Sequence, residues 1–163
     1  MSAVVVCTDV RDALSAGELA GIDTERWRRL AVAVLDDEGA VGELTLTFVD
    51  EDDIANLNEM HMGKQGPTDV LSFPLDDEVV PGVPVLLGDV VVCPSVAAAQ
   101  CADHAGTLDD ELALLVVHGV LHILGYDHAV PDDAARMRAR ERDLLAAHHW
   151  HGPVPPGFRQ AQD

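Results

Sequence analysis

Three histidines around one glycine constrain this chain more than any other feature of its sequence. The residues are His118, His122, Gly125 and His128, in the frame H-x-x-x-H-x-x-G-x-x-H. On a helix, His118 and His122 lie one turn apart on the same face. Gly125 can adopt the left-handed backbone conformation that ends a helix, and the resulting turn can bring His128 to the same point. The spacing therefore predicts three imidazoles around one metal ion, with a fourth position left open as in catalytic zinc sites.

The residue directly after the first histidine, Gly119, limits the chemistry of such a site. Zinc peptidases with a closely similar spacing carry a glutamate at this position, and that glutamate acts as the general base. The sequence thus predicts the ligands of a hydrolytic zinc site without the usual base of a peptidase. The alternative interpretation is a buried helix whose histidines are satisfied by hydrogen bonds alone.

The order of the predicted elements indicates an α+β fold. Alternating or β-branched runs predict strands near residues 4–6, 43–49, 70–73 and 85–92. Capping residues and apolar spacing predict helices near residues 24–37, 51–62, 94–103, 108–124 and 131–149. The helix over 108–124 is apolar on nearly all sides and must be buried. We expect one compact domain over residues 1–151 with a small mixed sheet, and a flexible tail over 152–163.

The chain is strongly acidic, with a formal net charge of −19. This charge argues against tight, unaided binding to bare duplexes, and no DNA partner is expected. Seven of the ten basic residues form two groups, namely Arg26, Arg28 and Arg29, and Arg136, Arg138, Arg140 and Arg142. We interpret the second group as a solvated helix face that pairs with acidic neighbours such as Asp133, Glu141 and Asp143.

The cysteines and the apolar runs predict a cytoplasmic protein. Cys7, Cys93 and Cys101 are odd in number and form no C-x-x-C pair, which argues against a disulfide framework and fits a reducing compartment. The first residues lack the basic region of a secretion signal. No stretch approaches the ~18 continuous apolar residues of a membrane span, so no membrane partner is expected.

Three segments of the sequence resemble one known family. The residues from His118 to His128 resemble the signature of the YbeY-type endoribonucleases, bacterial factors of ribosomal RNA maturation. The block Pro67–Pro74, P-T-D-V-L-S-F-P, and the run Gly88–Val92, G-D-V-V-V, are similar to two further hallmarks of that family, in the same order. With the pattern between them, the resemblance covers the chain from about residue 44 to residue 128.

This resemblance implies a fold, a cofactor and an activity. The fold would be a single α+β domain with a four-stranded sheet and a zinc-hydrolase-like site on a central helix, at the mouth of a cleft. The metal ligands would be His118, His122 and His128, holding one zinc ion per chain. The implied activity is cleavage of single-stranded RNA in 16S ribosomal RNA maturation and ribosome quality control. The expected partners are single-stranded or ribosomal RNA and the small ribosomal subunit.

The chain departs from the family pattern at one position. Many members carry an arginine one residue before the glycine that matches Gly63, and that arginine is thought to help bind or cleave RNA. Here the position holds Met62, which cannot hold a phosphate. Lys64 and His61 are the nearest residues that could take over this role, and a solvated loop residue and a helix-end residue are the structural alternatives.

The chemistry of such a site also favours RNA over peptide. Zinc held by three imidazoles lowers the pKa of bound water to ~7 and polarises a phosphoryl oxygen. The 2′-hydroxyl of RNA can act as an internal nucleophile, so the glutamate that is missing at position 119 is less necessary for RNA cleavage than for peptide cleavage.

Other polar residues are candidates for catalysis without a settled role. Asp127, Asp69, Ser72 and Lys64 are the candidates for proton transfer or substrate contact, with Asp89 as a further acidic residue; each also has an ordinary structural interpretation. His104 is read mainly as a loop residue, Trp27 mainly as a packing residue, and His148, His149 and His151 as a surface cluster. Two alternatives to the ribonuclease stay open: a zinc-dependent peptidase or amidase, and a non-catalytic, metal-stabilised ribosome-associated factor.

Overall fold

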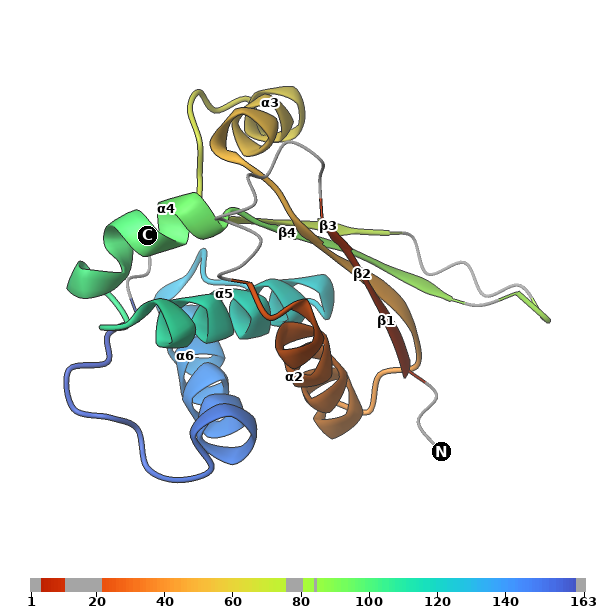
Figure 1. Ribbon diagram of the computed structural model, residues 1–163. Coiled ribbons are helices and arrows are strands. Elements are labelled where there is room, and N and C mark those ends of the chain that lie inside the picture. The colour runs from red at the N-terminus through yellow and green to blue at the C-terminus, as the bar shows by residue number, and fades with distance from the viewer. Residues whose placement is uncertain (1–3, 11–21, 76–80, 84, 161–163) are drawn as a thin grey trace.

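A four-stranded sheet carries helices on both of its faces (Figure 1). The computed structural model describes residues 4–10, 22–75, 81–83 and 85–160. In Figure 1, α2 and α5 lie on one side of the sheet, α6 packs against α5, and α3 lies on the opposite side. The arrangement confirms the predicted α+β fold.

The sheet is mixed, as predicted, with the order β1-β2-β4-β3. Its strands are β1 (Val4–Val10), β2 (Gly42–Phe48), β3 (Val70–Pro74) and β4 (Leu86–Val92). β1 pairs with β2 and β2 pairs with β4 in parallel, whereas β3 is antiparallel to β4. The hairpin of β3 and β4 therefore ends the sheet at β3, where the strand lies beside α5.

Capping residues set the helix boundaries as their types predict. The helices are α2 (Thr24–Asp37), α3 (Glu51–Met62), α4 (Pro94–Gln100), α5 (Leu108–Ile123) and α6 (Pro131–Leu145). The side chains of Asp23, Asp50 and Thr107 each accept a backbone N–H of the first turn of α2, α3 and α5. Gly63 ends α3 in the left-handed conformation, with a φ of 67°.

Two predicted helices end earlier than expected and continue as tighter or wider turns. The helix predicted to reach residue 103 is α only to Gln100 and continues as the 3₁₀ turn Cys101–Asp103. The helix predicted to reach residue 149 is α only to Leu145 and continues as the π turn Ala146–Trp150. Short 3₁₀ turns are frequent at helix ends, whereas π turns are rare.

The segment after this π turn packs on the domain, although the sequence predicted a flexible tail from residue 152. Phe158 is buried at 6% exposure, and its ring lies 4.8 Å from the ring of Trp150. The backbone N–H of Arg159 donates to the carbonyl of His104 at 3.0 Å. A buried aromatic ring and a backbone bond hold this segment, up to residue 160, against the fold.

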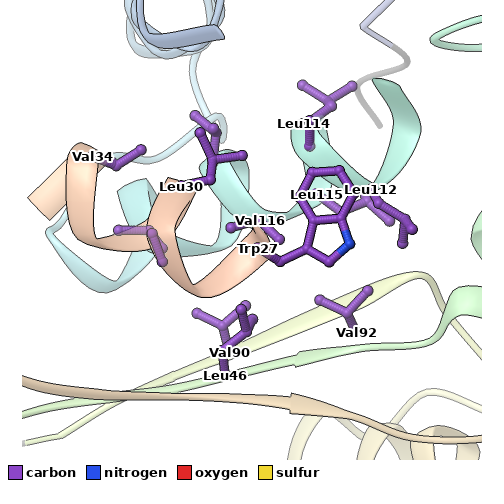
Figure 2. Close-up of a cluster of buried hydrophobic side chains, with 14 of the residues drawn as sticks. Trp27, Leu30, Val34, Leu46, Val90, Val92, Leu112, Leu114, Leu115 and Val116 are labelled. Carbon is purple, nitrogen blue, oxygen red and sulfur yellow. The ribbon is translucent and has the colours of Figure 1, made fainter. Parts of the chain in front are cut away.

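The main core lies between the sheet, α2 and α5. Trp27 is 1% exposed and is surrounded there by apolar side chains of α5 and the sheet, as Figure 2 shows for Leu112, Leu115 and Val92. Its indole is thus a packing group of α2, and stacking on a nucleobase is not available to it. In the described part of the chain, no helix is both long enough and apolar enough to cross a bilayer.

Candidate metal centre

The end of α5 brings the three histidines together. His118 and His122 lie on the last two turns of α5, and Gly125 then turns the chain with a φ of 102°. The N–H of Tyr126 donates to the carbonyl of Leu121 at 3.0 Å, which closes the turn. One ligand nitrogen from each histidine lies within 4.8 Å of the others, and the ring centroids are 4.5, 4.9 and 5.5 Å apart.

Hydrogen bonds on the far side of two rings fix their orientation. His118 Nδ1 lies 2.7 Å from Glu141 Oε2, and His122 Nδ1 lies 2.9 Å from the carbonyl oxygen of Tyr126. Because a carboxylate and a carbonyl only accept, each Nδ1 carries the hydrogen. The Nε2 lone pairs of both rings are therefore free to bind a metal.

Burial keeps His122 in the form that a metal needs. Desolvation lowers the pKa of His122, and the neighbouring imidazoles of His118 and His128 lower it further. The ring is therefore neutral at neutral pH, with a lone pair available. Three imidazole nitrogens suit zinc or a similar transition metal, whereas magnesium and calcium prefer oxygen ligands. The donor set thus fits the cofactor that the sequence predicted.

Glu141 corrects the prediction of a solvated face on α6. We expected its carboxylate among the acidic partners of the arginines, but its side chain is 0% exposed and bonds His118. A sequence signal existed, because Glu141 occupies a position in the helical spacing of the buried apolar residues of α6. These are Ala134, Met137, Leu144 and Leu145. A carboxylate at a core position of a helix needs a partner, and here the partner is a histidine of the triad.

Gly119 is small because α5 packs closely on the sheet. A Cβ atom at this position would lie 2.5 Å from Val90 Cγ1 and 3.3 Å from Ser72 Oγ. The general base of a zinc peptidase therefore has no room at position 119. This close packing explains why position 119 carries a glycine, the residue that argued against a peptidase in the sequence.

A cavity of about 420 Å³ opens beside the triad and holds most of the other candidates. It lies between α5, β3 and the loop that joins α3 to β3, and Lys64, Asp69 and Ser72 line it with the three histidines. Lys64 is the only lysine of the sequence, and it is exposed. Asn58 Nδ2 donates to the carbonyl of Gly66 at 3.0 Å, which ties this loop to α3.

Met62 also lines this cavity, so the position of the family arginine does face the site. His61, the other nearby candidate, is exposed, and its ring lies edge-on to Phe73 at 5.0 Å. Of these three residues, only Lys64 and Met62 line the cavity. Lys64 is therefore the better placed of the two candidates for the missing cation.

Hydrogen bonds occupy three of the catalytic candidates. Ser72 Oγ donates to the carbonyl of Gly119 at 3.0 Å. Asp69 accepts the N–H of Val70 at 2.7 Å and Gln100 Nε2 at 2.8 Å. Asp127 Oδ1 accepts the backbone N–H of His128 at 2.7 Å, a contact within the turn. In these contacts each residue supports the walls of the site, and a catalytic role for any of them stays a prediction.

A buried carboxyl forms the far end of the cavity. Glu111 lies two turns before His118 on α5 and is 1% exposed, and burial raises its pKa. His104 Nδ1 lies 3.5 Å from Glu111 Oε1. His104, which we interpreted from the sequence mainly as a loop residue, also lines the cavity. The sequence showed neither this pairing nor the place of Glu111.

The C-terminal histidines lie outside this site. His149 Nε2 lies 2.8 Å from Asp110 Oδ1, and His148 Nε2 pairs with Asp37. Among the described residues, the group that could hold a metal through three side chains is the triad alone. His148 and His149 thus anchor the π turn through carboxylate partners on α5 and α2.

Comparison with known proteins decides the family. The model of the family described as Endoribonuclease YbeY matches residues 15–149. The chain belongs to the YbeY endoribonuclease family. A family member from Thermobifida fusca is 46% identical over 132 residues, which are 76% of this chain and 84% of that protein. Another, from Salinispora tropica, is 46% identical over 140 residues, which are 78% of this chain and 89% of that protein.

A solved structure supports the same fold. The solution structure of TM1509 from Thermotoga maritima covers 95% of this chain and 100% of its own, with a TM-score of 0.56 and 24% sequence identity. The arrangement of strands and helices is thus shared with a protein of low sequence identity, and this likeness concerns the fold alone.

Proposed function

We propose that this protein is a zinc-dependent endoribonuclease that cuts single-stranded RNA during maturation of the small-subunit ribosomal RNA. The observation that carries the proposal is the triad of His118, His122 and His128, two of whose rings are held with Nε2 free, beside an open cavity. Membership of the YbeY endoribonuclease family supports the choice of RNA as substrate.

The protein's own residues would bind and orient the RNA. Bound zinc would supply a Lewis acid that polarises a phosphoryl oxygen and acidifies water. The triad would hold the ion. Glu141 and the Tyr126 carbonyl would keep the rings of His118 and His122 oriented toward it through their hydrogen bonds to Nδ1. The Lys64 ammonium would contact a phosphate next to the scissile bond, because it is the one lysine or arginine among the described residues that line the cavity.

The acidity of the chain supports a local contact with RNA. At a net charge of −19, a long stretch of nucleic acid would be repelled from most of the surface. An unpaired strand can enter the cavity beside the triad with a few nucleotides, whereas a stiff duplex cannot. The protein would therefore need a partner, for which we propose the small ribosomal subunit, to bring the RNA close.

Free thiols support a reducing compartment. Cys7 is exposed, Cys93 is buried and Cys101 is partly exposed, and all three are unpaired. An exposed thiol on a secreted protein would be open to oxidation. We therefore propose the cytoplasm, where ribosomal RNA is processed, as the place of action.

A cleavage assay on single-stranded RNA from the 16S region tests the proposed function. Zinc-loaded wild-type protein should cut it, and a chelator or His122→Ala should abolish the cut. His151→Ala, in the exposed turn after α6, is the matched control and should cut normally. Duplex RNA, single-stranded DNA and casein should remain intact. Cleavage of casein without cleavage of RNA would revive the peptidase.

Met62 gives one specific reason to test a non-catalytic role. If the cavity lacks a required cation, the metal would stabilise a ribosome-associated factor without cleaving RNA. In that case wild-type protein would bind zinc and gain stability but leave every RNA intact. Cleavage that is lost in His122→Ala, while circular dichroism shows a folded protein, excludes this candidate.

A further inference from the structure

We propose that the segment from Phe158 to Gln160 is a positioning element of the metal site and acts through the chain Gln160–Glu141–His118. This inference rests on the proposed metal site, because the three residues are connected to it in series. It assigns a function to the part of the sequence in which we expected a flexible tail.

Glu141 lies between the tail and the triad. Its Oε2 accepts His118 Nδ1 at 2.7 Å, and its Oε1 accepts Gln160 Nε2 at 2.9 Å. Each oxygen of this buried carboxylate therefore has a named donor. A carboxylate at 0% exposure that lost the donor on one oxygen would be left partly unsatisfied, and its side chain would shift toward another donor.

Both the nitrogen and the oxygen of the Gln160 side-chain amide form hydrogen bonds. Its Nε2 also donates to the carbonyl of Arg138 at 2.9 Å, and its Oε1 accepts Arg142 Nε at 2.7 Å. Three bonds to α6 thus set the orientation of the amide, with its N–H group toward Glu141. The amide and the carboxylate together define where Glu141 Oε2 meets the imidazole.

Neighbouring residues anchor the segment and connect it to the cavity. Phe158 is buried, and its ring contacts that of Trp150 at 4.8 Å. The N–H of Arg159 donates to the carbonyl of His104, whose ring lines the cavity. In Figure 1 the dark blue trace runs from the end of α6 back toward α4. Consecutive residues, Arg159 and Gln160, therefore support two histidines of the cavity.

Metal affinity should fall when this support is removed. Partners that hold a metal-binding histidine from outside are worth about 10–100-fold in affinity. Glu141→Gln should fall within that range, and Gln160→Met, which keeps the side-chain length but lacks the N–H donor, should cost about tenfold. Arg159→Ala is the matched control, because position 159 contributes its backbone N–H, which alanine retains.

The measurement is the zinc dissociation constant by competition with a fluorescent chelator, for the full chain and each variant. Proton NMR of the metal-free protein gives a second readout, since the hydrogen on His118 Nδ1 should lose its downfield resonance in Glu141→Gln and shift in Gln160→Met. A merely structural tail would lower thermal stability but move neither the affinity nor this resonance.

A double-mutant cycle decides whether Gln160 acts through Glu141. In the Glu141→Gln background, Gln160→Met should cost less than twofold in zinc affinity. Wild-type affinity in Gln160→Met, or an equal loss in both backgrounds, would overturn this inference and leave the proposed function standing. Wild-type protein that binds no zinc would overturn the metal site and this inference together. Cleavage of RNA plays no part in these measurements.

Discussion

A Cβ atom at position 119 would lie 2.5 Å from Val90 Cγ1, so α5 packs closely on β4 where Gly119 faces Val90. Gly119 directly follows His118 in α5. The distance between α5 and the sheet at Gly119 therefore also sets the position of His118, the first ligand. The glycine that leaves no room for a peptidase base thus also lets His118 lie close to the sheet.

Gly119→Ala should destabilise the protein by about 1–3 kcal/mol, the usual cost of overpacking a core. Urea titration measures this loss as a lower free energy of unfolding. The zinc affinity should also fall in Gly119→Ala, by a smaller amount. Val90→Ala provides the test of cause, since it removes the atom that the new methyl group would meet. In that background the cost of Gly119→Ala should be close to zero, and an undiminished cost would show that another contact is responsible.

Lys64→Ala should weaken binding of single-stranded RNA and lower the slope of log affinity against log salt by about 0.7, the value for one phosphate contact. Lys64→Arg should retain most of the affinity, and Met62→Arg should increase it by adding the cation that this chain lacks. Because Lys64 is the only lysine, reductive ¹³C-methylation gives one side-chain signal. That signal should move when RNA is added, and a static signal would exclude the contact.

Zinc should stabilise the folded protein through the triad. At a free concentration 100 times its Kd, a ligand that binds only the native state adds about 2.7 kcal/mol to the free energy of unfolding. Calorimetry of the wild-type protein with and without zinc measures this gain. His122→Ala should show none of it, and magnesium should not replace zinc because the donors are nitrogens.

Glu111 should make stability depend on pH. Burial raises the pKa of Glu111 in the folded state, so its contribution is fully present below the unfolded pKa of about 4.5 and is lost as the pH rises through the folded value. The free energy of unfolding of Glu111→Gln, relative to wild type, should therefore increase as the pH rises from 4 to 8. Urea titrations of metal-free protein at each pH measure the difference, and a constant difference would contradict the assignment.

Cysteine reactivity should follow burial. Cys7 is exposed and should react first with iodoacetamide, whereas Cys93 is buried and its pKa is raised by desolvation. Mass spectrometry after a short pulse should show Cys7 modified and Cys93 intact until urea unfolds the domain. Equal labelling of both thiols in the native protein would contradict this prediction, because it would show that local unfolding near the end of β4 exposes Cys93.

Local signals in the sequence predicted the elements and the triad well. The caps Asp50 and Thr107 and the terminator Gly63 act within one helical turn, so their effect can be read from neighbouring residues. His118 and His122 converge because of helical spacing, and the turn at Gly125 adds the third ring. None of this requires knowledge of how distant segments pack.

The support of the site could not be predicted in the same way. Glu141 lies 23 residues from His118, and Gln160 lies 19 residues from Glu141, so their contacts exist only once α6 and the tail have packed. The hydrogen bond to Glu141 also explains why a carboxylate is tolerated at a position with apolar spacing. The pairing of His104 with Glu111 was also not evident from the sequence, because the two residues lie on different elements and meet only once the loop before α5 has folded.

The bond between Gln160 and Glu141 has a consequence for the order in which the protein is made. A growing chain contains all three histidines once residue 128 has been added, yet the amide that steadies His118 from behind is translated only 32 residues later. A nascent chain that lacks Gln160 would thus bind its metal ion weakly, and the full metal affinity would be reached only after Gln160 has been added. We therefore expect a chain that stops before residue 160 to bind its metal more weakly than a chain that contains Gln160.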